Sequence, residues 1–581
     1  MRVSVCWILM ACCAAGATLV HATEWPHHGR DPGGQRLAPI ADVNPDSIRR
    51  LVPKWIWQSG IVGTFQATPI VVGSVMYVSL PFSHVAALDA ASGRELWRYK
   101  HSRKVETPCC GPANRGVAVD GGRVFVGTVD ARLVALDAET GQVLWDVEVA
   151  PQLERTEALA TGMGQARVSG SSGVGIAAAP LVFDGRVIVG ITGVGYGLHL
   201  DGAREGAPVG AVIGLPGDYG GIGFMAAFDV VSGQRLWKFD TVRKPEDGGW
   251  EGDYVETTPD GVALNRDVES EQAQAPGRPD AWRYGGGSVW SASAIDPATG
   301  HLFFGVGNPS PQMDDGGRPG DNLYTSSIVA IDARSGRYLW HYQQVPHDLW
   351  GYDVASPPVL FEAQVDGQSV PALGQASKLG WFYVHDRRDG RLLWKSEAIV
   401  PQENLFARAT PEGVRITPGA AGGVNWSPVA LDPSRQRAYV AAMHMPMVYW
   451  LKSLPAQDDK PERPYFELTP SDEPRWGVLA AVNLARGGQL AWSARTPQPL
   501  VGGVLALASG LVFTGEGDGH LSAFDGNSGQ RLWQFQCGAG VNAPPIAYRV
   551  GGKSRIAVAA GGSQIWGYPQ GGAVIAFGLQ D

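Results

Sequence analysis

The chain has 581 residues, of which 18% are charged, and its formal net charge is −9 at pH 7. The sequence contains no basic run, so nucleic-acid binding has no support. The 78 glycines and 41 prolines are interspersed with alternating apolar runs, which is typical of a turn-rich all-β protein and excludes a low-complexity chain.

The N-terminus has the pattern of a secretory signal. Arg2 precedes an apolar stretch at 3–20, which ends close to a small-x-small cleavage pattern. We therefore expect residues 1–23 to be a signal peptide and residues 24–581 to form a single mature domain in a bacterial periplasm. A lipid anchor at Cys12 is the less favoured alternative. No later stretch is long and apolar enough to predict a transmembrane segment.

A hairpin phrase then recurs along the chain. In its first copy, Asp89 is followed by Ser92-Gly93 and, eight residues after the Asp, by Trp97. Such a segment predicts a tight turn between two strands, because Asp can cap its own backbone and Gly accepts a positive φ. The other copies begin at Asp137, Asp229, Asp332, Asp386 and Asp525, and a degenerate copy runs from Asn483 to Trp492.

Hairpins repeated in this way cannot each bury a hydrophobic face alone, so they must stack on one another. Two partial copies, at 294–300 and 430–432, add to the seven visible ones. The repeats therefore predict an all-β fold, an eight-bladed β-propeller with tryptophan-docking repeats that occupies residues 24–581.

Removal of the signal would leave Cys109, Cys110 and Cys537 as the cysteines of the mature chain. Neighbouring Cα atoms are about 3.8 Å apart, below the usual disulfide range that starts near 4.4 Å, so a bond between Cys109 and Cys110 would close a strained ring. The residues alone leave both the disulfide and two reduced thiols open. No Cys-x-x-Cys-His is present, so no covalently attached haem is predicted.

Cys109-Cys110 is followed by Asn114-Arg115-Gly116. With this motif and the tryptophan-docking repeats, the chain resembles the periplasmic quinoprotein alcohol and methanol dehydrogenases. That family holds pyrroloquinoline quinone (PQQ) on the axis of an eight-bladed propeller. The resemblance covers nearly the whole mature chain. Further family phrases occur in the family's order at 286–290, 305–309, 318–322, 346–350, 377–380 and 423–426.

The resemblance implies roles for particular residues around PQQ. A disulfide between Cys109 and Cys110 would pack on one face of the ring and Trp290 on the other. Arg115 would pair with a PQQ carboxylate. Taken singly, each residue could instead have a purely structural role. The remaining implied roles are Lys378 beside the quinone oxygens, Asn425 and Gln66 as further PQQ contacts, and Asn308 as a metal ligand.

The chain departs from the family pattern where a Ca²⁺ or lanthanide ion is expected. Gly195 stands where the family has a metal-binding Glu, and Gly351 where it has the catalytic Asp. Asp353 points to the same face as residue 351 if the segment is a strand, so we expect it to act as base or metal ligand with help from Lys378. The reserve candidates are Asp348 and, in the insertion at 198–220, Asp201, Glu205 and Asp218.

Two functions follow from these observations. In the first, the protein is a periplasmic PQQ-dependent dehydrogenase that oxidises an alcohol or related hydroxylated substrate and passes electrons to an external acceptor such as a c-type cytochrome. In the second, it is a catalytically degenerate propeller that binds PQQ or another ligand, or serves as a protein-interaction scaffold. The acidic segment at 246–282 is predicted to cover the central funnel.

Overall fold

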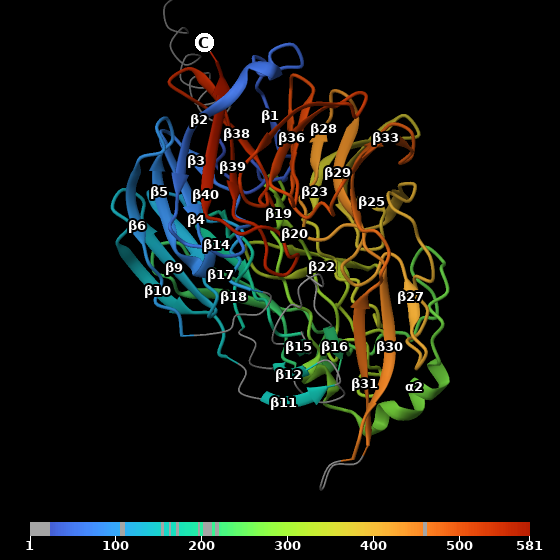
Figure 1. Ribbon diagram of the computed structural model, residues 1–581. Helices are drawn as coiled ribbons and strands as arrows, with labels where there is room; N and C mark the ends of the chain where they lie inside the picture. The colour runs from blue at the N-terminus through green and yellow to red at the C-terminus, as the bar shows by residue number, and fades with distance from the viewer. Residues whose placement is uncertain are drawn as a thin grey trace, which may run out of the picture.

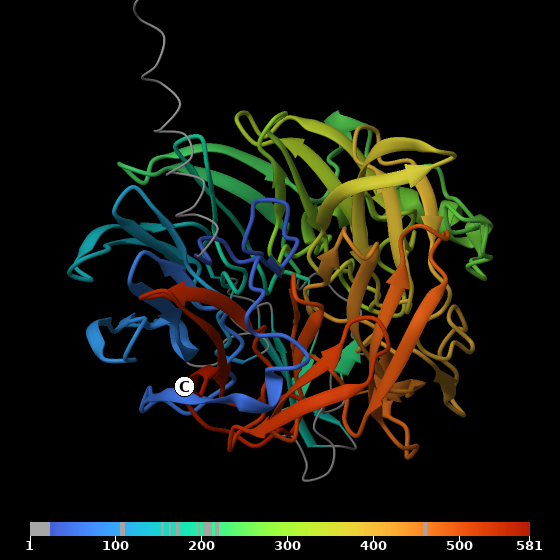
Figure 2. The same ribbon diagram turned by 90° about the horizontal axis from the view of Figure 1, so that it is seen from above.

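The computed structural model describes residues 24–104, 111–152, 156–161, 164–169, 174–195, 198–200, 212–214, 220–456 and 462–580. Eight antiparallel blades surround a central axis, as the view from above shows (Figure 2). The predicted all-β, eight-bladed propeller is thus confirmed. No helix in the described ranges is long and apolar enough to cross a membrane.

The first four blades take their strands in chain order (Figure 1). Each is a four-stranded meander whose first strand is short. Blade 1 contains β3 (Ile70–Val72), β4 (Val75–Ser79), β5 (Val85–Asp89) and β6 (Glu95–Tyr99), and blade 2 contains β7 (Ala118–Asp120), β8 (Arg123–Gly127), β9 (Arg132–Asp137) and β10 (Val143–Glu148). Blade 3 contains β13 (Leu181–Phe183), β14 (Arg186–Gly190), β17 (Phe224–Asp229) and β18 (Arg235–Asp240), and blade 4 contains β19 (Ala294–Asp296), β20 (His301–Gly305), β21 (Ser327–Asp332) and β22 (Tyr338–Gln343).

The next three blades continue the same order, and blade 7 gains a parallel strand from the N-terminal segment. Blade 5 contains β23 (Val359–Val365), β24 (Gln368–Ala376), β25 (Phe382–Asp386) and β26 (Leu392–Lys395), and blade 6 contains β28 (Ala430–Asp432), β29 (Arg437–His444), β32 (Trp476–Asn483) and β33 (Leu490–Thr496). Blade 7 contains β34 (Val504–Leu507), β35 (Leu511–Gly515), β36 (His520–Asp525) and β37 (Arg531–Gln536), with β1 (Leu37–Ala38) beside β34.

Blade 8 closes the ring from both ends of the chain. It contains β38 (Ile546–Val550), β39 (Lys553–Ala560) and β40 (Ala573–Leu579), and β2 (Leu51–Gln58) pairs antiparallel with β40. This blade carries no copy of the hairpin phrase. The partial copies at 294–300 and 430–432 instead belong to blades 4 and 6, so they do not add the eighth blade that they were expected to supply.

The hairpin phrase joins five of the blades to the next blade around the ring. Trp97 of blade 1 donates its indole N–H to the carbonyl of Ala138 in blade 2, at 3.0 Å. Gly141, in the turn of blade 2, has a φ of +73°, and a Cβ there would lie 2.5 Å from Trp97 Cε3. The Gly is therefore needed for both its backbone angle and the close approach of the ring. Trp145, Trp237, Trp340 and Trp492 make the corresponding bonds to the carbonyls of Val230, Ala333, Arg387 and Gly526.

Replacing Gly141 with Ala is expected to destabilise the propeller by about 2–5 kcal/mol. The positive φ accounts for about 1–2 kcal/mol and the collision with Trp97 for about 1–3 kcal/mol. Gly122 is the matched control, since its φ is +75° and an added Cβ would meet nothing within 4 Å. The measurement is the urea midpoint of unfolding. Equal losses in the two variants would contradict a docking role for Trp97.

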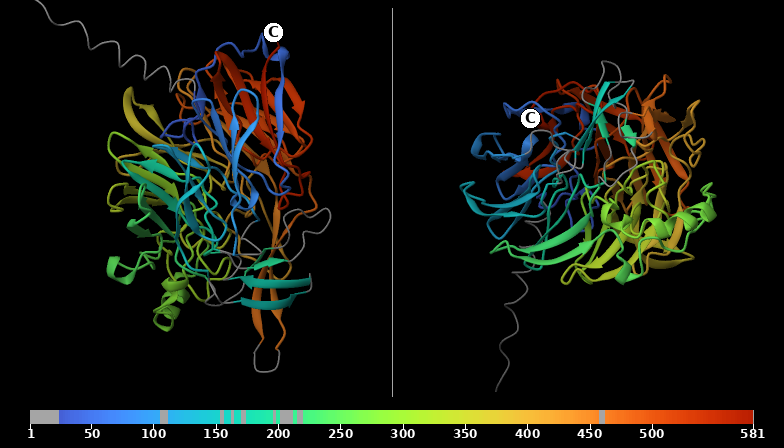
Figure 3. Two further views of the ribbon diagram at one scale, coloured as in Figure 1. Left: turned by 90° about the vertical axis from the view of Figure 1, so that its left-hand side faces the viewer. Right: turned by 90° about the horizontal axis from the view of Figure 1, so that it is seen from below.

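Insertions in several blades build a ninth sheet that the repeats did not predict. It has seven strands and projects from one end of the propeller (Figures 1 and 3). Met447, the first residue of β30, also lines the axial cavity described below, so the sheet begins at that cavity. In sheet order the strands are β11 (Thr156–Thr161), β12 (Gly164–Ser169), β15 (Leu198–Leu200), β16 (Val212–Gly214), β31 (Arg463–Pro470), β30 (Met447–Leu454) and β27 (Val414–Ile416).

The segment at 246–282 contains the single α-helix of the described residues, α2 (Val268–Gln274). Asp267 caps this helix by accepting from the Ser270 amide. Asn265 ties the segment to the Phe406 carbonyl. No residue of 246–282 lines the axial cavity, and α2 lies at the end of the propeller that carries the seven-stranded sheet (Figure 1).

Candidate active site

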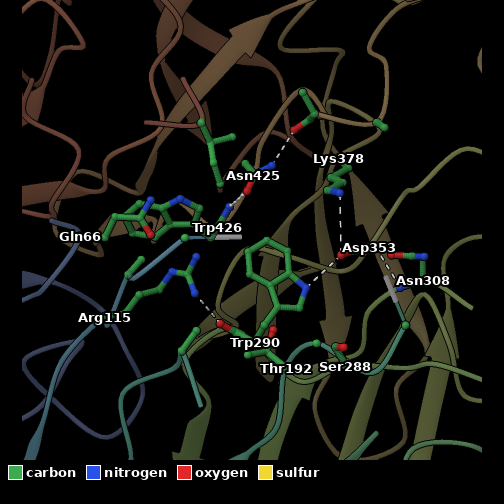
Figure 4. Close-up of a pocket in the computed structure, with 18 of the residues that line it drawn as sticks. Gln66, Arg115, Thr192, Ser288, Trp290, Asn308, Asp353, Lys378, Asn425 and Trp426 are labelled. Atoms are coloured by element: carbon green, nitrogen blue, oxygen red, sulfur yellow. Dashed lines mark hydrogen bonds and ion pairs between the residues drawn. The ribbon is translucent and has the colours of Figure 1, made fainter. Parts of the chain in front are cut away.

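A cavity lies on the propeller axis and is lined by loops from six or more blades (Figure 4). Its volume is about 170 Å³. One water molecule needs roughly 10–15 Å³ on the same measure, so the space suits a ligand of many atoms. The described residues that the sequence singled out for the cofactor and metal all line it: Gln66, Arg115, Trp290, Asn308, Asp353, Lys378 and Asn425.

Cys109 and Cys110 lie outside the described residues, so the predicted disulfide stays a prediction. Gly111, which follows them directly, lines the cavity. Before the pair, the Lys104 amide donates to Asp130, which also accepts from His101 and Thr128. Burial alone would raise the pKa of Asp130, but these hydrogen bonds hold it well below its usual range. The charged Asp130 thus holds the backbone at Lys104 in place.

Arg115 lies between two aromatic rings. Its guanidinium carbon is 5.1 Å from the ring centroid of Trp290 and 4.9 Å from that of Trp426. Arg115 Nη1 also donates to the Trp290 carbonyl at 2.9 Å, while its backbone is held by hydrogen bonds to Ala177 and Thr68. A buried guanidinium fixed in this way is suited to a planar anionic ligand, because its donors form a flat fork and its charge is little screened.

Asp353 connects the other predicted residues. Its Oδ1 accepts from the backbone N–H of Asn308 and its Oδ2 from the indole N–H of Trp290, both at 2.9 Å (Figure 4). Lys378 Nζ lies 3.9 Å from Asp353 Oδ2 and donates to the Gly351 carbonyl at 2.8 Å. The cavity thus holds a carboxylate that is hydrogen-bonded to an indole and ion-paired with an ammonium.

Three polar atoms in the cavity wall are buried without a hydrogen-bond partner among the described residues. They are Gln66 Oε1, Gln312 Oε1 and Trp426 Nε1. Buried polar atoms are normally satisfied, so orphaned ones that line a cavity indicate a polar ligand. Together with Arg115 and the flat face of Trp290, they fit PQQ, a planar ring system with carboxylates and quinone oxygens.

Asn425 lies in the wall, but both groups of its amide bond within its own loop. Its Nδ2 donates to the Ala421 carbonyl at 2.8 Å, and its Oδ1 accepts from the Trp426 amide at 2.9 Å. Asn425 therefore fixes the position of Trp426 beside Arg115.

The donor set for a metal ion is small. The described residues contain no group of three or more His, Cys, Asp or Glu side chains that could hold a metal. Asp353 is the single carboxylate among the described residues of the cavity wall, and Asn308 keeps only its amide oxygen, since its Nδ2 donates to the Pro309 carbonyl. Hard cations take six to eight oxygens, with several carboxylates among them. The described residues do not fit such an ion, and Asp201, Glu205 and Asp218 fall outside them.

Asp348, the reserve candidate, is structural. It is fully buried, does not line the cavity, and accepts from the amides of Trp350 and Gly351 and from Ser326 Oγ. Burial raises its pKa, and the nearby Asp353 carboxylate raises it further. Its hydrogen bonds shape the turn that places Gly351 and Asp353.

Sequence reasoning missed Gln312 and the apolar wall. Gln312 comes from the loop between β20 and β21, and no local pattern distinguishes its amide from other loop residues. The apolar wall consists of side chains from two loops and from the first residue of β30, and nothing in their spacing connects them. Its members are Ala420, Ala421, Met447, Ile565 and Trp566.

The cysteine prediction can be tested by counting thiols in the denatured mature protein. With Cys109 and Cys110 bonded to each other, we expect one free thiol, that of Cys537, and three after reduction. Cys537 is free in the structure, and burial raises the pKa of its thiol to about 12, so it should react only after unfolding. Three reactive thiols before reduction would rule the disulfide out.

Comparison with known proteins identifies relatives of this chain. A sequence model described as "PQQ: Glucose/ethanol/alcohol dehydrogenase, beta-propeller domain" matches residues 25–405 and 400–556. Quinoprotein alcohol dehydrogenase PedH of Pseudomonas putida is 30% identical over 558 residues, which cover 92% of this chain and 84% of that protein. Quinohemoprotein alcohol dehydrogenase ADH IIB of Pseudomonas putida is 32% identical over 582 residues, covering 95% and 75%.

Among solved structures, quinohemoprotein alcohol dehydrogenase ADHIIG of Pseudomonas putida HK5 matches with a TM-score of 0.76 and 28% identity, covering 97% of this chain and 82% of that one. A europium-containing methanol dehydrogenase also has a TM-score of 0.76, at 24% identity, and covers 97% and 100%. The second likeness concerns the fold alone. With its propeller, its axial cavity and these matches, the chain belongs to the PQQ-dependent alcohol dehydrogenase family.

Proposed function

We propose that this protein binds PQQ in the axial cavity and oxidises an alcohol or a related hydroxylated substrate. The observation that carries the proposal is the buried guanidinium of Arg115, fixed between Trp290 and Trp426 beside the orphaned polar atoms of the wall. The relatives named as alcohol dehydrogenases support the reaction type. When bound, PQQ supplies the two-electron acceptor for hydride from the carbon that bears the hydroxyl.

The chain's own residues have distinct roles in this proposal. Arg115 binds a carboxylate of the cofactor, and Trp290 offers the flat face beside it. Lys378 donates to a quinone oxygen. Asp353 removes the proton of the substrate hydroxyl at Oδ2, and the N–H groups of Trp290 and Asn308 keep that carboxylate in place.

The apolar wall sets the type of substrate. Met447, Ile565 and Trp566 offer hydrocarbon surface, and the methyl groups of Ala420 and Ala421 leave room beside it. We propose that the carbon chain of the alcohol packs here, because burial of apolar area favours binding and keeps water away from the reacting carbon.

We further propose that the protein works in the bacterial periplasm and passes electrons to a separate acceptor, a c-type cytochrome. In this proposal residues 1–23 are removed as a signal peptide and residues 24–581 form one propeller domain. The secretory pattern of the N-terminus and the absence of a haem-attachment motif support it. Mass spectrometry of the exported protein checks the cleavage site, and a lipid-modified Cys12 would contradict it.

The decisive experiment is a PQQ titration of the mature protein, followed by absorbance and by reduction of an artificial dye with a panel of alcohols. We expect saturable PQQ binding and alcohol-dependent dye reduction. Saturable binding without turnover would favour the scaffold function, which is supported by the presence of only one carboxylate in the part of the cavity wall that the structure describes. Absence of PQQ binding would overturn both assignments.

A further inference from the structure

Among the described residues, the cavity wall has one carboxylate, and it already accepts hydrogen bonds from protein donors. Asp353 Oδ1 accepts from the Asn308 amide and Oδ2 from the Trp290 indole. The ammonium of Lys378 lies 3.9 Å from Oδ2. A metal ion bound to Asp353 would share oxygens that already accept two hydrogen bonds, and it would lie close to a like charge.

The space beside Gly351 is filled by a neutral group. Gly351 has a φ of +80°, which favours glycine, and a Cβ there would collide with Gln312 Nε2. The carboxamide of Gln312 thus occupies the volume into which a side chain at 351 would extend. An amide can accept or donate a hydrogen bond, but it brings no charge to balance a cation.

The net charge of the cavity needs no divalent ion to match that of the family. The family that the sequence resembles has carboxylates at the positions of Gly195 and Gly351 and a Ca²⁺ or lanthanide ion. Removing two negative charges together with one Ca²⁺ ion leaves the net charge around the cofactor unchanged. The cations that remain in the described cavity wall are Arg115 and Lys378, and they face one carboxylate, Asp353.

We propose that this chain holds PQQ without a metal ion, with the ammonium of Lys378 as the cation nearest to Asp353 in the described cavity wall. Arg115 is the second cation, on the other side of Trp290. The proposal rests on PQQ binding as proposed above. It departs from the expectation of a Ca²⁺ or lanthanide ion because the described donors are one carboxylate and one amide oxygen.

The first test compares PQQ affinity with and without metal. The mature protein is stripped with EDTA, and PQQ binding is measured by equilibrium dialysis in EDTA, in excess Ca²⁺ and in excess La³⁺, with metal content by mass spectrometry. We expect the three dissociation constants to agree within about twofold. We also expect no stoichiometric metal in the PQQ complex.

The second test restores one carboxylate. Gly195 lines the cavity without a positive φ, and a Cβ there would lie 3.2 Å from the Asn308 carbonyl oxygen, so a side chain needs only a small shift of its neighbours. Gly195→Glu adds an oxygen donor near Asn308 and Asp353. We expect its PQQ affinity to rise about tenfold on adding Ca²⁺ or La³⁺. Gly195→Gln, which has the same size without the charge, should remain insensitive to metal.

The outcomes separate the two proposals. A wild-type affinity that rises tenfold or more with Ca²⁺ or La³⁺, or one metal ion retained per chain, would overturn the metal-free site and leave PQQ binding intact. Absence of PQQ binding in every buffer would overturn the proposed function as well. Equal metal responses in Gly195→Glu and Gly195→Gln would show that the added carboxylate does not complete a donor set, which also contradicts the inference.

Discussion

Asp353→Asn is expected to lower kcat for alcohol-dependent dye reduction by about 100- to 10,000-fold, the usual range for loss of a general base. The carboxamide keeps the size of the side chain and can still accept from the Asn308 amide, but it cannot take a proton. PQQ binding, followed by absorbance, should remain. The kcat is measured at saturating PQQ and alcohol.

The control for this variant is Trp290→Phe. Asn at 353 also weakens the hydrogen bond that Asp353 Oδ2 accepts from the Trp290 indole. Phe at 290 removes the same bond while keeping the carboxylate and an aromatic face. We expect the loss of kcat in Trp290→Phe to be much smaller. Similar losses in the two variants would mean that orientation of residue 353, and not proton removal, limits turnover.

Arg115→Ala is expected to weaken PQQ binding by about 30-fold or more, which corresponds to about 2 kcal/mol. Arg115 is 8% exposed, and its guanidinium lies against the rings of Trp290 and Trp426. Truncation removes the charge that meets a PQQ carboxylate and also the group that separates the two rings. The measurement is the dissociation constant for PQQ by equilibrium dialysis.

Arg115→Lys separates charge from shape. Lysine keeps the positive charge but loses the planar fork and much of the contact with the indoles. We therefore expect a PQQ affinity between that of wild type and that of Arg115→Ala. Thermal unfolding without PQQ measures how much of the Ala effect comes from lost packing. An unchanged PQQ affinity in Arg115→Ala would place the cofactor elsewhere.

The fold could be predicted because the information for blade-to-blade contact is local and repeated. The Trp and the Gly each recur at a fixed position of successive hairpins, and Trp97 of one hairpin contacts Gly141 of the next. One spacing therefore specifies both the turn and the docking. Closure of the ring could not be predicted in this way. β2 pairs with β40 across almost the whole chain, and no repeat marks a contact between such distant segments. The seven-stranded sheet could not be predicted for the same reason, because it joins insertions from separate blades.

For the site, the family phrases in the sequence were enough to predict which side chains lie at the axis. The residues that the family phrases indicated, among them Arg115, Trp290 and Asp353, converge in one cavity because each follows or precedes a strand of its blade at the same end of the propeller. The neighbours of these side chains could be identified only from the three-dimensional structure. The carboxamide of Gln312 occupies the space beside Gly351 because two loops that are distant in the sequence pack together. Packing of this kind produces no periodic pattern in a sequence.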